Sequence, residues 1–315
     1  MRAARIAVSA APVTDLAILY EHPAWFQPLF AALDRRGVDY RAFTPDLAWD
    51  PAGTPPPAHV VFNRIAMSSF LRSGEHPIFF ATALFDHWRR GGARVVNGAD
   101  VLAVDASKAR QLSLLSSLGL AIPATRIVHR AADVPAAAEA IGFPLVVKAN
   151  IGGSGAGIAR LDNMGELRAV IANGGLPVSV DGVLLVQDYV PARGGSITRI
   201  ETLDRRFLYA LDVAGAGQFD LCPADACGPT VAMTATQPAP ELVAGAEAIA
   251  RAAGIDVGGV EVMVDDRDGV ARFYDVNALS NFVARPLDVL GWDPHERLVD
   301  YLSDVIGSDV TGKDR

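Results

Sequence analysis

The sequence predicts an α/β protein of two or three lobes, and three observations support this. Half of its 315 residues are hydrophobic, so the chain can bury a sizeable core. Short β-type segments alternate with helical segments across roughly residues 1–105, which is typical of a parallel sheet covered by helices. Beyond residue 186 the pattern becomes rich in strands, which indicates a further lobe.

Residues 1–105 are expected to form the first lobe, which a proline-rich loop over residues 51–57 interrupts. The predicted helices, each followed by glycine, are residues 28–36 and 81–90. The predicted strands are Arg5–Ser9, Leu16–Tyr20, Tyr40–Phe43, Val60–Phe62 and Val95–Val96.

Residues 106–186 are expected to form the second lobe, and residues 187–315 the third. Ser107 can cap a helix that runs to Leu118. The other predicted helices are residues 131–141, 166–172, 241–253 and 295–306. The predicted strands are residues 145–148, 183–186, 196–202, 207–213, 260–264 and 271–276, of which the last two form a hairpin.

The composition argues against several classes of protein. A net charge of −8 is unlike the basic surface of a nucleic-acid-binding protein. No apolar run approaches the roughly 18 to 20 residues that span a bilayer. Thr14 and Asp15 interrupt the N-terminal apolar stretch, so no signal peptide is expected. Two cysteines are too few for a disulfide scaffold. We therefore expect a cytoplasmic protein.

Lysine is rare in this chain, which makes its positions informative. Of the 28 basic residues only Lys108, Lys148 and Lys313 are lysines. The abundance of Ala, Arg, Gly and Pro indicates a coding background that favours arginine on ordinary surfaces. Against this bias, an internal lysine marks a place where a compact ammonium charge is needed. Lys313 lies in a polar tail.

A glycine-rich loop follows the strand that ends at Lys148. It reads Gly152, Gly153, Ser154, Gly155, Ala156, Gly157. Glycines let a backbone approach oxyanions closely, so that its N–H groups can cradle phosphate. The loop is neither a P-loop nor a dinucleotide fingerprint, and a glycine cluster alone can be a flexible turn. The nearby lysine favours phosphate binding, because it could reach the α- and β-phosphates of a nucleotide.

Three residues with oxygen ligands lie on the predicted hairpin. Asp275 and Asn277 are two residues apart and therefore point to one face, and Glu261 lies on the other strand. Such oxygens suit Mg²⁺, which usually takes one or two carboxylates together with the phosphates of ATP. The alternative is that these residues simply face water.

A segment of mainly polar residues follows the predicted strand at residues 183–186. Gln187, Asp188, Tyr189 and Val190 leave a buried strand, where backbone groups could meet an adenine edge or where the strand could simply end.

Asn63 and Arg64 follow the fourth strand of the first lobe, with Arg72 nearby. Because ligands bind at the ends of parallel strands and arginine forks pair with carboxylates, these three residues are candidates for binding substrate. Arginine is common in this chain, so an ordinary role is the alternative.

Taken in chain order, these features resemble the ATP-grasp superfamily, and within it the ligases that add glutamate to a ribosomal protein. The resemblance covers roughly residues 104–302. Its five elements are the segment around Lys108, Lys148 with the glycine loop, the hinge at residues 187–190, Arg199, and the set Glu261, Asp275 and Asn277.

The resemblance implies an ATP-grasp fold preceded by an α/β pre-grasp domain. It also implies an enzyme that uses ATP and Mg²⁺ or Mn²⁺ to convert a carboxylate into an acylphosphate, which an amine attacks to give an amide, ADP and phosphate. Lys108 and Lys148 would contact the nucleotide phosphates. Catalysis would rest on positioning and charge neutralisation, with Arg199 and, for the acylphosphate or substrate carboxylate, Arg285.

The chain departs from the family pattern in ways that concern the acceptor. The metal set reads Glu/Asp/Asn where relatives commonly read Asp/Glu/Asn, and Ile197 replaces an aspartate. Asp220 and Asp225 lie where those ligases carry a basic loop, which points to an acceptor with a cationic amine and away from glutamate addition. Cys222 and Cys227 have poor zinc spacing, which favours a role in this loop or in packing.

Two other functions stay open from the sequence. An ATP-grasp kinase would transfer phosphate to a small molecule and stop, whereas a nucleotide-binding module would not catalyse at all. The substrates could be small molecules or peptides. A homodimer is expected on general grounds, since most oligomers are symmetric dimers.

Overall fold

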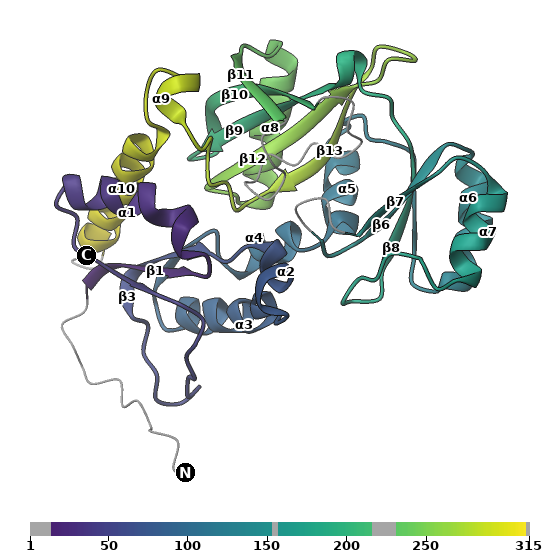
Figure 1. Cartoon of the computed structure of the whole chain (residues 1–315). Helices are drawn as coiled ribbons and strands as arrows, with labels where there is room; N and C mark the ends of the chain where they lie inside the picture. The colour runs from purple at the N-terminus through teal and green to yellow at the C-terminus, as the bar shows by residue number, and fades with distance from the viewer. Residues whose placement is uncertain (1–13, 153–156, 216–230, 313–315) are drawn as a thin grey trace.

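The computed structural model describes residues 14–152, 157–215 and 231–312 and has an α/β architecture with one parallel and two antiparallel sheets (Figure 1). The predicted strand at residues 5–9 lies outside the described residues. So do Gly153, Ser154, Gly155, Asp220, Asp225 and both cysteines. Within the described residues, no helix is long and apolar enough to cross a membrane.

The first sheet has the strand order β2-β1-β3-β4, with every pair parallel, which confirms the predicted parallel layer. Its strands are β1 (Thr14–Tyr20), β2 (Tyr40–Phe43), β3 (Ala58–Arg64) and β4 (Arg94–Val96). Its helices are α1 (Pro23–Arg35), η1 (Met67–Ser69), α2 (Phe70–Ser73), α3 (Pro77–Arg90) and α4 (Ala99–Asp105).

Alternate residues of β1 pack against helices on opposite faces of this sheet. Ala17 and Leu19 belong to the apolar cluster with α3, whereas Leu16 and Ile18 pack with α1 and with α10 (Pro294–Gly312). This division follows the two-residue period of a strand. The last helix of the chain therefore returns to the first sheet (Figure 1).

Helix α1 begins at Pro23, so the prediction that it begins at Pro28 was wrong. The Nδ1 atom of His22 accepts a hydrogen bond from the Trp25 amide at 3.3 Å, and Pro23 occupies the first turn. Pro28 lies inside the helix. Both prolines resemble helix starts, and histidine is not one of the usual capping residues, so no sequence pattern favours the earlier proline.

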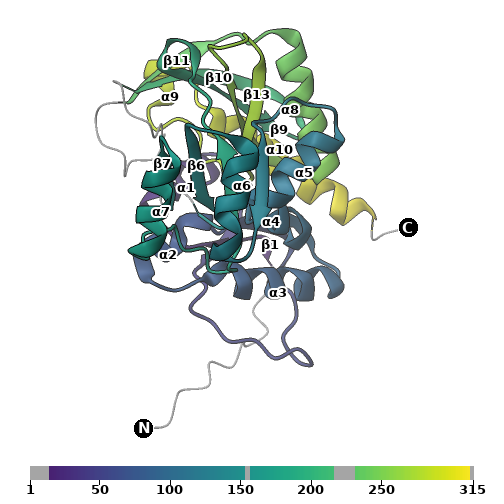
Figure 2. The same cartoon turned by 90° about the vertical axis from the view of Figure 1, so that its right-hand side faces the viewer.

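The second sheet is antiparallel, in the order β5-β8-β6-β7. Its strands are β5 (Thr125–Val128), β6 (Leu145–Ala149), β7 (Ile158–Leu161) and β8 (Leu184–Asp188), and its helices are η2 (Ala131–Asp133), α6 (Val134–Ile141) and α7 (Met164–Ala172). The helices lie on the outer side of the sheet (Figure 2). Leu145 and Val147 pack beneath them, so Lys148, the next residue of β6, points to the opposite face.

The third sheet is also antiparallel, in the order β11-β10-β9-β12-β13. Its strands are β9 (Ser196–Leu203), preceded by η3 (Arg193–Gly195), β10 (Arg206–Gly215), β11 (Val231–Thr236), β12 (Val257–Val264) and β13 (Ala271–Asn277). Helices α5 (Lys108–Ser117) and α8 (Pro240–Ala253) pack with Ile200, Val260 and Val276 on one face. Arg199 and Glu261 are the sequence neighbours of Ile200 and Val260, so they lie on the other face of the sheet. After β13 the chain forms the short helix α9 (Pro286–Val289).

Candidate active site

The strand register brings the predicted metal ligands together. Glu261 on β12 lies opposite Asp275 on β13, and on its other side it lies opposite Arg199 on β9. The Nδ2 atom of Asn277 is 3.4 Å from Oδ2 of Asp275. Two carboxylates, one amide and one guanidinium from three adjacent strands thus share one face of the third sheet.

Arg199 is held by acidic and hydroxyl groups on several sides. Its Nε donates to Glu201 at 2.6 Å, its Nη1 to Glu261 at 3.3 Å, and its Nη2 to Oγ of Ser280 at 3.5 Å. Burial disfavours the charged guanidinium, but the two carboxylates outweigh this effect and raise the pKa of Arg199. The arginine is therefore a fixed positive charge on this face.

Lys108 forms an ion pair with Asp275, and both side chains are largely buried. Burial works against the ammonium, but the neighbouring Asp275 raises the pKa of Lys108 above its ordinary value. In the second sheet, the Nζ of Lys148 lies 5.7 Å from the centre of the Tyr274 ring. Both internal lysines of this lysine-poor chain therefore reach β13.

Tyr274 links Lys148 to the carboxylates. Its hydroxyl donates to Oε2 of Glu261 at 2.8 Å, while its ring lies beneath the lysine. Burial and the neighbouring Asp275 raise the pKa of Glu261. The charge of Arg199 and the hydrogen bond from Tyr274 act in the opposite direction, because both stabilise the ionised carboxylate.

The donor set fits a hard divalent cation that keeps phosphate oxygens among its ligands. Among the described residues there is no group of three or more His, Cys, Asp or Glu side chains that could hold a metal ion. Glu261, Asp275 and Asn277 offer two carboxylates and one amide, and Mg²⁺ typically takes one or two carboxylates with substrate phosphates. The ammonium of Lys108 on Asp275 shows that this position already accepts a cation.

A short stretch of backbone connects the segments that carry the two lysines. Ser107 caps α5, where its Oγ accepts a hydrogen bond from the Arg110 amide at 3.3 Å. The Lys108 amide then donates to the carbonyl of Asn150 at 3.3 Å, and Oδ1 of Asn150 accepts from the Ala109 amide at 2.8 Å. Asn150 is two residues beyond Lys148, so the start of α5 and the end of β6 are fixed together.

At one end of the glycine loop, the structure shows why position 157 is a glycine. Gly157 has φ +75°, and a Cβ atom there would lie 2.9 Å from Cβ of Ala149. Its carbonyl accepts a hydrogen bond from the Ala149 amide at 2.8 Å. Any side chain would both strain the backbone and collide with β6. Gly152 lies at the other end, directly after the buried Ile151.

Two backbone amides and one side chain of the predicted adenine hinge already donate hydrogen bonds within the protein. The amides of Asp188 and Tyr189 donate to the carbonyls of Ala124 and Pro144 at 2.9 and 3.2 Å, and Gln187 donates to Oγ1 of Thr125 at 2.9 Å. The amide of Val190 makes no hydrogen bond within the described residues. This amide is therefore available to an adenine edge.

The substrate candidates of the first sheet have internal partners. Asn63 donates to the carbonyl of Asn97 at 2.9 Å and accepts from the Ile65 amide at 2.9 Å. Arg64, which is only 2 % exposed, donates to the carbonyl of Ser280 and to Asn281. Burial lowers the pKa of Arg64 to about 9.

Two further predicted arginines pair with acidic neighbours away from this cluster. Arg72 pairs with Glu21 and lies over the ring of Trp25, with 4.6 Å between its Cζ and the ring centre. Arg285 lies at the surface, with an 82 % exposed side chain 3.6 Å from Asp288. Neither arginine contacts the Glu261 and Asp275 cluster within the described part of the chain.

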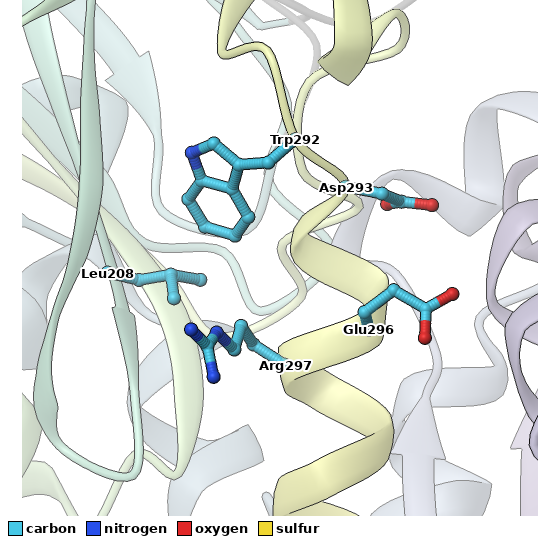
Figure 3. Close-up of a pocket in the computed structure, with 5 residues that line it drawn as sticks. All are labelled: Leu208, Trp292, Asp293, Glu296 and Arg297. Carbon is cyan, nitrogen blue, oxygen red and sulfur yellow. The ribbon is translucent and has the colours of Figure 1, made fainter.

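A separate pocket of about 500 Å³ lies beside the start of α10 (Figure 3). Leu208 and Trp292 face each other across it, with Arg297 below, and the carboxylates of Asp293 and Glu296 point to the other side of the helix. Glu296 is 2.6 Å from Arg35. The pocket contains none of the residues predicted from the sequence, so we assign it no part in the chemistry.

Sequence reasoning missed Glu201, Tyr274 and Gln111. Glu201 is 1 % exposed, and its two-residue spacing from Arg199 on one strand was a usable signal. Tyr274 points to the same side of the site as Glu261 because the strand register is irregular after Glu261, which no sequence pattern indicates. Gln111 is a buried helix residue whose partner lies on a distant strand.

Comparison with known proteins agrees with this geometry. Residues 105–285 match the model of the RimK-like ATP-grasp domain. A probable alpha-L-glutamate ligase 2 of Shewanella frigidimarina is 28 % identical over 142 residues, which are 44 % of this chain and 46 % of that protein. The chain thus spans about half the length of the curated relatives that it matches.

Two solved structures share the fold over nearly the whole chain. The ATP-grasp ligase PsnB, solved with a phosphomimetic precursor variant, Mg and ADP, has a TM-score of 0.69 at 17 % identity and covers 93 % of this chain and 99 % of its own. A RimK domain ATP-grasp protein of Sphaerobacter thermophilus has a TM-score of 0.66 at 23 % identity, with 91 % and 98 % covered. With its family match over more than half of its length, the chain belongs to the RimK-like ATP-grasp family.

Proposed function

We propose that this chain is an ADP-forming ligase that uses Mg·ATP, or Mn·ATP, to join a carboxylate to an amine. The observation that carries the proposal is that Lys108 and Arg199 contact the carboxylates of Asp275 and Glu261, while Lys148 lies over the ring of Tyr274, whose hydroxyl donates to Glu261. A related protein is named an alpha-L-glutamate ligase, and PsnB was solved with Mg and ADP, which supports both the reaction class and the cofactors.

Each group of residues has a role in the proposed binding of nucleotide. The two lysines neutralise phosphate oxygens, the glycine loop offers amides to them, and the Val190 end of the hinge meets the adenine. Glu261, Asp275 and Asn277 hold the cation, which when bound supplies charge neutralisation at the phosphates. Lys108 must leave Asp275 to reach a phosphate, so nucleotide and metal binding are coupled.

The reaction has two balanced steps. An oxygen of the substrate carboxylate attacks the γ-phosphorus, the bond to the β-phosphate breaks, and ADP leaves. The amine then attacks the acyl carbon, the bond to phosphate breaks, and the amine loses a proton as the amide forms. Arg199 lies 3.3 Å from Glu261, a proposed ligand of the cation that binds the phosphates. We therefore assign Arg199 to stabilise the transferring phosphoryl group, and such positioning supplies much of the rate of phosphoryl transfer.

The acceptor is a small molecule or a peptide, and Asp220 and Asp225 favour one with a cationic amine. Asn63, Arg64 and Arg72 stay candidates for binding substrate, and Arg285 for the acylphosphate, although each needs to change partners to do so. We also propose a cytoplasmic protein, divided at residues 105 and 186 and acting as a homodimer.

An ADP-release assay with Mg·ATP and pairs of carboxylates and amines tests the proposal. We expect ADP release that depends on both partners and that EDTA abolishes. A Lys148→Ala chain should lose about 100-fold in turnover, a typical loss for one group that stabilises transferring charge. Lys313→Ala, in the polar tail, is the matched control. A stable phosphoester formed without any amine would instead identify a kinase.

A further inference from the structure

Gln111 completes the free edge of the third sheet. Among the described residues β13 is the last strand of that sheet, so no described strand pairs with its outer backbone groups. The Nε2 of Gln111 donates to the carbonyl of Val276 at 2.8 Å, and its Oε1 accepts from the Val276 amide at 3.2 Å. One side-chain amide therefore takes the place that a residue of a sixth strand would occupy.

This contact is made where the candidate metal ligands lie. Val276 stands between Asp275 and Asn277, and Gln111 is one helical turn after Lys108, on the same side of α5. Asp105, just before the helix, accepts a hydrogen bond from the Ala278 amide at 2.7 Å, and its carbonyl accepts one from Gln111 at 3.0 Å. The corner between α4 and α5 is thus bonded to the end of β13.

The other contacts of α5 with this sheet are the Lys108–Asp275 ion pair, which must open when nucleotide binds, and apolar packing. Leu112 and Leu115 are buried in the apolar cluster of the sheet. Apolar burial is non-directional, so it holds the helix against the sheet but resists sliding only weakly. The paired hydrogen bonds to Val276 have directions, and Gln111 is 1 % exposed, so water cannot replace them.

We propose that Gln111 is a positioning residue that sets Lys108, as a phosphate-binding group, in register with Asp275 and Asn277, as ligands of the divalent cation. The inference rests on the proposed nucleotide site and adds a residue that touches neither nucleotide nor metal. It acts through Val276 and through the first turn of α5.

The experiment measures the affinity for ADP with Mg²⁺, together with thermal unfolding, for four chains. We expect Gln111→Leu to bind Mg·ADP about tenfold more weakly than wild type. Thr202→Val is the matched control, because Thr202 is also 1 % exposed and donates to the Gly258 carbonyl at 3.1 Å within the same sheet. It should lose a similar amount of thermal stability but bind Mg·ADP as wild type does.

Gln111→Glu should make the binding of Mg·ADP depend on pH, an effect that loss of stability alone does not produce. A neutral carboxylic acid has one donor, so it can donate to the Val276 carbonyl and accept from the Val276 amide while losing the bond to the Asp105 carbonyl, whereas a carboxylate can only accept. Because position 111 is buried beside two carbonyl oxygens, we expect the pKa of the introduced carboxyl to lie far above its ordinary range. Binding of Mg·ADP by this variant, relative to wild type at the same pH, should therefore be nearly complete at pH 6 and fall towards that of Gln111→Leu by pH 8.5.

The outcomes separate the two proposals. A wild-type chain that binds no Mg·ADP overturns the proposed function and this inference with it. If wild type binds and Gln111→Leu binds equally well, the positioning role alone is wrong. Should Gln111→Leu fail to fold, a Gln111→Glu chain whose relative affinity is the same at pH 6 and pH 8.5 overturns the role equally.

Discussion

Tyr274 contacts two residues of the candidate site at once, Glu261 and Lys148. Its hydroxyl donates to Glu261, and its ring lies under Lys148. Tyr274→Phe removes the first contact and keeps the second. Loss of a group that orients a metal ligand typically weakens metal binding 10- to 100-fold, so we expect Mn²⁺ affinity in the presence of ADP to fall by about tenfold.

Titration of Mn²⁺ by electron paramagnetic resonance checks this prediction. Tyr274→Leu removes the ring as well and should additionally weaken ADP binding in the absence of metal, which Tyr274→Phe should not. If Tyr274→Phe bound Mn²⁺ as tightly as wild type, Glu261 would not depend on the hydroxyl for its orientation.

The same scale shows which site residues a sequence can predict. Lys108 and Lys148 stand out because lysine is rare, and Asp275 and Asn277 because their spacing puts them on one face of a strand. Arg64 also follows a predicted strand. Its guanidinium, however, is bound by the carbonyl of Ser280, a contact across more than 200 residues of sequence that no local pattern contains.

At the scale of elements, the turn between β12 and β13 fastens the segment that joins the second and third sheets. The Asp266 amide donates to the Pro191 carbonyl at 2.9 Å. Nη1 of Arg267 donates to Asp188 at 3.1 Å, and its Nε donates at 3.0 Å to Asp265, which has no exposed surface. Bidentate arginine pairs of this kind combine charge with fixed geometry.

Arg267→Met should therefore loosen this segment. The ion pair with Asp188 is partly exposed and worth little by itself, but Asp265 would lose its main donor in a buried place. We expect the hydrogen-bonded amides of Asp188 and Tyr189 to exchange with solvent about tenfold faster, as measured by hydrogen–deuterium exchange. Arg193→Met, which breaks only the exposed 3.3 Å pair with Asp266, is the control and should leave this exchange unchanged.

Elements with a buried apolar face were predictable, and short strands without a continuous apolar pattern were not. The helix after Ser107 and the strand ending at Lys148 were both confirmed, because each has a buried face. β5 and β7 were missed. They are four-residue strands at the two edges of the second sheet, and each exposes an arginine, Arg126 or Arg160, so neither shows a continuous apolar pattern.

At the scale of the whole molecule, the ends of the first sheet hold the chain that leaves the site. Asn97, just after β4, donates to the carbonyls of Val257 and Ala278 at 2.6 and 2.7 Å and accepts from the Asp256 amide at 2.8 Å. Asn63 in turn donates to the carbonyl of Asn97. The strand end that resembled a substrate site therefore sets where β12 begins and where the segment after Asn277 runs.

Asn97 combines this role with an uncommon backbone conformation, so two substitutions separate the effects. It is 1 % exposed and has φ +51°, a region that asparagine tolerates better than most residues and glycine tolerates freely. Asn97→Gly leaves several buried backbone groups without partners and should lower the free energy of unfolding by about 3 kcal/mol. Asn97→Ala adds backbone strain and should cost about 1 kcal/mol more.

Equilibrium unfolding in urea measures both differences, with Asn173→Ala at an exposed helix end as a control that should change stability by less than about 0.5 kcal/mol. Equal costs for the glycine and alanine variants would show that the positive φ carries no strain. Because Ala278 directly follows Asn277, both variants should also weaken Mn²⁺ binding, although neither touches the site. Unchanged Mn²⁺ affinity in destabilised variants would show that the first sheet supports the fold without positioning the proposed metal ligands.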